Sequence, residues 1–126
     1  MKFWTGMFWS AALFNFAVGI GLGLFGEALY PQFGLDYTAT DHIWRYMSAI
    51  LIGMYGVGYA LAAIDPSQNR NLIILGMFGK LFIVLLIGGL YMTGLATAQL
   101  AGTVAVDLVY VFLFFVFLYR TRTGAL

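Results

Sequence analysis

Four continuous apolar stretches constrain this 126-residue chain more than any other feature. They cover about residues 3–25, 43–64, 72–92 and 100–119. Each holds about 20 residues, enough for an α-helix to cross a hydrocarbon layer of about 30 Å. Barrel strands would be about half as long and would alternate apolar with polar residues. We therefore predict an all-α integral membrane protein, a single domain over residues 1–126 built as an antiparallel bundle of four transmembrane helices.

Composition excludes several classes of protein. Hydrophobic residues make up 63% of the chain and charged residues 9%, whereas a soluble domain carries roughly 25% charged residues. A net charge of +1 argues against a nucleic-acid partner, which requires a basic face. The chain has no cysteine, so it has neither disulfides nor thiolate metal ligands. The bilayer is the partner that this composition predicts.

Basic residues predict the orientation of the bundle. The first stretch is too long for a signal peptide and lacks a cleavage site, so we interpret it as a retained helix. An even number of spans then places both termini on one side. That side carries most of the basic residues, namely Lys2, Arg70, Arg120 and Arg122, while Arg45 lies on the other. By the positive-inside rule we expect both termini to be cytoplasmic.

Two ionisable residues lie deep within the predicted spans. At 1.5 Å per residue, Lys80 lies roughly 14 Å and Asp107 roughly 20 Å from the cytoplasmic boundary. Charges at such depth are costly and need a partner. A lysine side chain can bridge this offset by snorkelling, so we expect Lys80 and Asp107 to form an ion pair.

Further polar residues occur at similar depth and predict one polar seam through the bundle. Its expected members, besides the ion pair, are Asn15, Tyr55, Tyr59 and Tyr110. Helical spacing places Arg45, Ser48 and Ile52 on the same stripe as Tyr55 and Tyr59. Three interpretations stay open: the pair fixes helix register, the seam binds a polar ligand or carries protons or ions, or Lys80 snorkels outward and does not meet Asp107.

Acidic residues and the single histidine collect on the predicted outer side. This outer cluster comprises Glu27, Asp36, Asp41, His42 and Arg45. Asp41 and Arg45 are spaced i, i+4, so we expect a local ion pair, with Glu27 as the alternative partner of Arg45. One histidine excludes a bis-histidine haem or a histidine-rich metal site within one chain. The sequence indicates no metal and no cofactor.

Small residues and phenylalanines mark the helix surfaces. Small-xxx-small patterns begin at Gly19, Ala49 and Gly56, and such patterns permit close helix packing within a bundle or between copies. Four phenylalanines crowd the last stretch, at positions 112, 114, 115 and 117. We expect them to contact lipid or a partner subunit.

A motif spans the second and third stretches. Tyr55-Gly56-Val57-Gly58-Tyr59 leads through Ala62-Ala63-Ile64-Asp65-Pro66 to Arg70 and Gly76-Met77-Phe78-Gly79-Lys80-Leu81. The motif resembles small bacterial four-span proteins similar to the DoxX-like membrane families, in which an acidic residue early in the last span, here Asp107, is usual. The resemblance implies a bacterial inner-membrane bundle in which Asp65, Arg70, Lys80 and Asp107 act together, and it implies no reaction.

Three functions remain open at this point. The first is a non-enzymatic accessory or structural subunit of a membrane complex, or a small homo-oligomer, because phosphate-loop, G-x-S-x-G and HExxH motifs are missing. The second is an oligomeric transporter or channel for ions or small solutes that uses the polar seam. The third is an intramembrane lipid-modifying enzyme, although such chemistry usually needs two deep acidic groups.

Overall fold

The computed structural model describes residues 1–38 and 41–123. Within these ranges the chain forms four helices: α1 (Lys2–Gln32), α2 (Asp41–Ile64), α3 (Arg70–Met92) and α4 (Ala98–Arg120). Each helix is long and apolar enough to cross a membrane, judged by its length and composition. The prediction of an all-helical chain with four candidate membrane spans is therefore confirmed.

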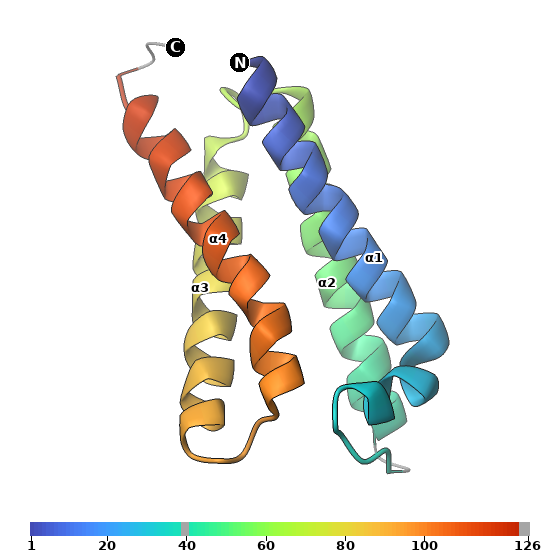
Figure 1. Ribbon diagram of the computed structural model, residues 1–126. Coiled ribbons are helices and arrows are strands. Elements are labelled where there is room, and N and C mark those ends of the chain that lie inside the picture. The colour runs from blue at the N-terminus through green and yellow to red at the C-terminus, as the bar shows by residue number, and fades with distance from the viewer. Residues whose placement is uncertain (39–40, 124–126) are drawn as a thin grey trace.

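The helices form two antiparallel hairpins, α1–α2 and α3–α4. The N-terminus, the α2–α3 turn and the end of α4 lie at one end of the molecule, which we call the terminal end (Figure 1). The opposite end, where α1 and α3 finish, is called the loop end. The backbones approach closely within each hairpin, whereas those of α1 and α4 come close at few positions. Helices α2 and α3 lie closest near the turn that joins them and diverge toward the loop end (Figure 1).

The hydrophobic core joins the two hairpins at the terminal end. The ring of Phe8 on α1 is fully buried, and its centroid lies 5.2 Å from those of Phe114 and Phe117 on α4. Trp4 packs edge-on against Phe117 at 5.4 Å. From α2 and α3 the same cluster includes Tyr59, Ala62, Ala63 and Ile73. Large buried rings thus hold the hairpins together at one end only, which leaves space between them farther along.

The expected lipid or partner contact of the α4 phenylalanines is wrong for two of the four. Phe114 and Phe117 are buried in the core, whereas Phe112 and Phe115 are 65% and 56% exposed. Each pair is spaced three residues apart and shares a helix face, so one face meets α1 and the other points outward. Composition could not tell these faces apart because all four residues are the same.

Helix α1 continues past its predicted end. Phe25 has non-helical angles (φ −121°, ψ 19°), so the predicted boundary at residue 25 coincides with a kink, and helix resumes as far as Gln32. Nη1 of Arg45 donates hydrogen bonds to the backbone oxygens of Leu22 (3.2 Å) and Gly23 (2.8 Å). Kinks occur where a side chain inserts into the i to i−4 hydrogen-bond ladder, and this guanidinium satisfies carbonyls beside the kink.

Small residues allow close contact between α1 and α2. A Cβ atom added at Gly19 would lie 3.0 Å from the Ala49 oxygen and 3.2 Å from the Gly53 nitrogen. The pattern that begins at Gly19 therefore serves packing inside the bundle, one of the two roles that the sequence left open.

A hydrogen bond links the hairpins at the loop end. The Thr97 hydroxyl donates a 2.6 Å hydrogen bond to the backbone oxygen of Phe33 and accepts one of 3.2 Å from Leu100 N, which caps α4. Gly34 follows with φ +71°, a left-handed conformation that suits glycine after a helix end. The space between the hairpins is therefore bounded by the core at one end and by this contact at the other.

Candidate functional site

A cavity of about 320 Å³ lies between the two hairpins. All four helices contribute to its lining: Phe14, Asn15 and Val18 from α1, Leu51, Ile52, Tyr55 and Tyr59 from α2, Gly79, Lys80 and Ile83 from α3, and Thr103 and Asp107 from α4. Five of the six residues of the predicted seam are among these side chains. The cavity is thus mainly apolar with a few convergent polar groups, the usual character of a small-molecule site.

The ion pair between Lys80 and Asp107 is present and lines this cavity. Lys80 is 5% exposed, and its ammonium group donates to Asp107 Oδ1 and, at 3.1 Å, to Asn15 Oδ1. The Nζ atom lies 5.2 Å from the ring centroids of Tyr59 and Tyr110, within the range of cation–π attraction. The charge is compensated on several sides, as burial in an apolar setting requires.

Asn15 extends this network to the remaining helix. Its Nδ2 atom donates a 3.0 Å hydrogen bond to the backbone oxygen of Ile52, so its carbonyl oxygen is free to accept from Lys80. The chain of contacts runs from Ile52 on α2 through Asn15 on α1 and Lys80 on α3 to Asp107 on α4. One residue from each helix is therefore tied to a common centre.

Several groups in the cavity keep unused hydrogen-bonding capacity among the described residues, and Lys80, Asp107 and Tyr55 supply three of them. An ammonium group has three donors, and Lys80 uses two of them. The Oδ2 atom of Asp107 accepts no hydrogen bond from residues 1–38 or 41–123. The hydroxyl of Tyr55 likewise has no partner within those ranges, although its ring packs against Gly79. These groups can contact a molecule in the cavity.

Tyr110, the sixth residue of the predicted seam, lies beside Lys80 but outside the cavity lining, and its hydroxyl is 2.9 Å from that of Ser10. On α2 the predicted stripe is wrong at one end, because Ser48 is exposed and Arg45 is buried against α1. Arg45 extends toward the carbonyls at the α1 kink, so it does not join the polar seam.

Both ion pairs expected for Arg45 in the outer cluster are wrong. Within the described part of the chain no carboxylate lies at ion-pair distance from this residue. Asp41 instead accepts from the backbone nitrogen of Thr38 at 2.6 Å, and Glu27 lies 3.8 Å from His42 Nε2. His42 also contacts the Tyr37 hydroxyl at 2.7 Å through Nδ1. Asp36 is exposed. Backbone oxygens at the kink take the place of the carboxylate because they also need a donor.

The turn that contains Asp65 and Arg70 lies apart from the cavity and makes contacts within the fold. Asp65 accepts from the Ser67 hydroxyl at 2.8 Å, which organises the turn. Arg70 donates to the hydroxyl of Thr121 and, at 3.1 Å, to the backbone oxygen of Leu118, so it binds the end of α4. Ten residues of helix, roughly 15 Å, separate Arg70 from Lys80. The four charged residues of the motif therefore form two separate sets in the described structure.

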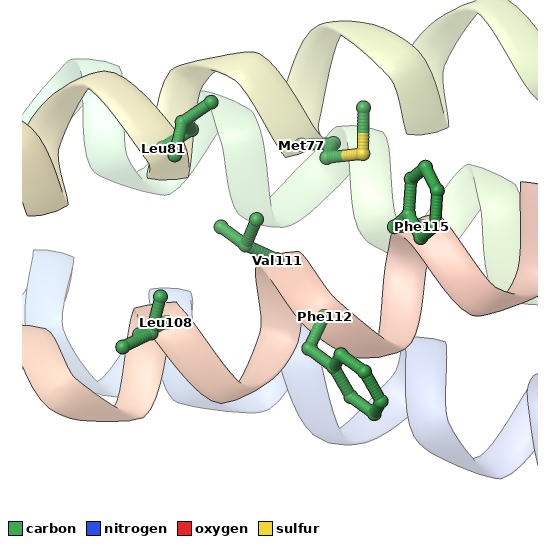
Figure 2. Close-up of a pocket in the computed structure, with 6 residues that line it drawn as sticks. All are labelled: Met77, Leu81, Leu108, Val111, Phe112 and Phe115. Atoms are coloured by element: carbon green, nitrogen blue, oxygen red, sulfur yellow. The ribbon is translucent and has the colours of Figure 1, made fainter.

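A second cavity, of about 490 Å³, lies on the outer side of the α3–α4 hairpin. Figure 2 shows its lining, which comes from α3 and α4: Met77, Leu81, Leu108, Val111, Phe112 and Phe115. None of these residues is polar, and several are exposed. This cavity has no group that could orient a polar ligand, and its surface suits lipid chains.

Sequence reasoning missed most of the apolar lining of the polar cavity. The positions nevertheless follow from helical periodicity: Val18 lies three residues after Asn15, and Ile83 three after Lys80. Residues at this spacing share a helix face. Considering the residues one helical turn before and after each deep polar residue would have identified them.

Neither a metal site nor a related protein assigns a further role to these residues. Among residues 1–38 and 41–123, no group of three or more His, Asp or Glu side chains is placed to hold a metal ion. The chain matches no protein-family model, no curated protein and no solved structure. The DoxX-like resemblance thus rests on the sequence motif alone.

Proposed function

We propose that this protein is a non-enzymatic, multi-pass protein of the bacterial inner membrane that binds a small amphiphilic molecule between its two hairpins. The observation that carries this proposal is the cavity of about 320 Å³ with the Lys80–Asp107 pair in its wall. Ligand sites typically begin at volumes of about 300 Å³ and combine apolar walls with a few polar groups.

The hydrogen-bond pattern supports a binding role over a purely structural one. A pair that only fixed helix register would be stable with all its polar capacity satisfied inside the bundle. Here Asp107 keeps one carboxylate oxygen without a partner among the described residues, and its side chain is 17% exposed. Asp107 lines the cavity, where a ligand can use this oxygen.

Charge distribution supports the proposed orientation, with both termini in the cytoplasm. Lys2, Arg70, Arg120 and Arg122 belong to the terminal end of the bundle, while Asp36, Asp41 and Glu27 belong to the loop end. Under the positive-inside rule the terminal end faces the cytoplasm. The cavity then lies between the two faces of the membrane.

The wide exposure of apolar side chains fits a subunit of a homo-oligomer or of a larger membrane complex. Phe112 and Phe115 of α4 are more than half exposed and line the second, apolar cavity of Figure 2. Lipid covers such a surface in a single copy, and the helix of a neighbouring subunit suits it equally well.

Transport is the second candidate, and the loose association of the hairpins favours it. The backbones of α1 and α4 come close at few positions, and α2 and α3 diverge toward the loop end (Figure 1). Separation of the hairpins would expose the Lys80–Asp107 pair without disrupting either hairpin. An enzymatic role has less support, because Asp107 is the single carboxylate among the described residues that line the cavity.

A pair of matched substitutions on α1 tests the binding proposal. Val18→Phe fills the cavity, whereas Leu13→Phe adds the same ring at a position that is 65% exposed. Wild-type and variant proteins are purified in a mild detergent, and small molecules that co-purify with them are identified by mass spectrometry. We expect the same molecule with wild type and Leu13→Phe and its loss with Val18→Phe.

Two results would contradict the proposal: an equal amount of the molecule on Val18→Phe, or no stoichiometric small molecule on any of the three proteins. Flux measurements in proteoliposomes test the transport alternative. Flux that stops in Val18→Phe and persists in Leu13→Phe would favour transport through this cavity over static binding.

A further inference from the structure

We propose that the molecule bound in this cavity is an uncharged amphiphile whose head carries a hydroxyl group. This inference rests on the binding role proposed above and specifies its ligand class. It follows from three features of the described lining: its net charge, its unused hydrogen-bonding groups and the position of its apolar walls.

The charge of the lining favours a neutral head. Lys80 and Asp107 are the charged residues that line the cavity, and they neutralise each other. An anionic head at the remaining N–H of Lys80, or a cationic head at Oδ2 of Asp107, would add a third charge to a lining that holds no counter-charge for it. A buried charge without a partner is strongly unfavourable in an apolar surrounding. A neutral head leaves the pair intact.

The unused groups match a hydroxyl. Asp107 Oδ2 can only accept a hydrogen bond, the remaining N–H of Lys80 can only donate one, and the Tyr55 hydroxyl can do either. A hydroxyl head can donate to Asp107 and accept from Lys80 or Tyr55 at the same time. A ketone or ester head would only accept and would leave Asp107 Oδ2 unpaired.

The walls predict an apolar body attached to this head. Phe14, Val18 and Ile52 surround the polar groups with hydrocarbon. The volume of about 320 Å³ has room for about ten water-sized groups, enough for a head and the first carbons of a chain. Leu51 and Ile83 line the same cavity and are 58% and 46% exposed, so they mark its opening. The rest of the chain leaves there toward the lipid.

Three photoreactive probes that differ only in their heads test this inference. A long-chain alcohol, the matching carboxylate and the matching amine, each with a diazirine near the head, are mixed with the full chain in lipid nanodiscs at neutral pH. Illumination and peptide mapping measure labelling of the segments that contain Leu51–Tyr55 and Gly79–Ile83. We expect the alcohol to label these segments at least tenfold more than either charged probe.

The Val18→Phe and Leu13→Phe variants separate the two proposals. If the three probes label wild type equally and Val18→Phe abolishes the labelling, the cavity binds amphiphiles without selecting the head, which overturns this inference and leaves the proposed function intact. Preferential labelling by the carboxylate or the amine also overturns it. If Val18→Phe leaves the labelling by all three probes unchanged, the result contradicts both this inference and the proposed function.

A conservative substitution tests the hydrogen-bond assignment. Tyr55→Phe keeps the ring and removes the one hydroxyl of the described lining that makes no hydrogen bond to the protein. We expect labelling by the alcohol to fall about threefold to tenfold, the range of one hydrogen bond, with no change for the two charged probes. Tyr119→Phe, at a position 57% exposed near the end of α4, is the matched control and is expected to leave all three unchanged. Unaltered alcohol labelling in Tyr55→Phe would remove Tyr55 from the site.

Discussion

Two buried cations, Arg45 on α2 and Lys80 on α3, are compensated by different kinds of partner. Each is 5% exposed in a helix long and apolar enough to cross a membrane. Arg45 binds the backbone oxygens of Leu22 and Gly23 at the kink of α1. Lys80 binds the carboxylate of Asp107 and the amide oxygen of Asn15.

The difference separates a structural cation from one suited to a site. The carbonyls beside a kink belong to the fold, and Arg45 packs so closely on Gly26 that an added Cβ atom there would overlap its side chain. Lys80 has a charged partner on another helix and faces a cavity. Burial alone therefore identifies neither role, whereas the kind of partner does.

The largest expected effect comes from breaking the Lys80–Asp107 pair. Lys80→Met or Asp107→Asn alone should lower the free energy of unfolding by about 3–5 kcal/mol, because each leaves a buried charge without its partner. The double variant should recover most of that loss. Denaturant titration in mixed micelles measures both, with Lys2→Met at an exposed position as control. A double variant no more stable than the singles would refute the ion pair as a stabilising unit.

The Arg45 contact should respond differently to charge removal. Arg45→Met should destabilise the protein less than Lys80→Met, because no unpaired charge remains when backbone carbonyls lose a donor. Neutralising a nearby carboxylate, as in Asp41→Asn, should give no recovery in the double variant. The same titrations measure these differences, and recovery by Asp41→Asn would show that Arg45 pairs with that carboxylate after all.

The close contact at the kink predicts a third, smaller effect. A Cβ atom at Gly26 would overlap the Arg45 side chain, so Gly26→Ala should cost about 1–3 kcal/mol through overpacking. Gly21→Ala is the matched control on the same helix, because its Cβ would meet only Leu29 Cδ1 at an ordinary 3.6 Å. Thermal unfolding of the two variants in one detergent compares them. Equal stability would mean that Arg45 is free to move away from the kink.

The smallest effect is expected at Glu27. Its carboxylate lies 3.8 Å from the exposed His42 and is itself largely exposed, so Glu27→Gln should change the free energy of unfolding by less than about 0.5 kcal/mol. The size of the loss shows whether Glu27 makes only an exposed contact with His42 or also an ion pair with the buried Arg45. A loss as large as that of Arg45→Met would assign Glu27 to the buried cation.

Sequence alone predicted the four helices because each apolar run is long enough to satisfy its own backbone within hydrocarbon. It also predicted the Lys80–Asp107 pair, since a charge at that depth requires a partner and each of these residues was the obvious partner for the other. It predicted five of the residues that line the polar cavity by the same reasoning from depth.

Only the tertiary structure decided the rest, because those features depend on which helix faces which. It assigned Arg45 to backbone carbonyls, which no count of charges reveals. It divided identical phenylalanines on α4 between the core and the exterior. It placed the large rings at one end of the bundle, and the cavity exists because the hairpins are packed together there and not along their whole length. Local periodicity selects the faces of a helix, and only the packing of helices against one another decides what each face meets.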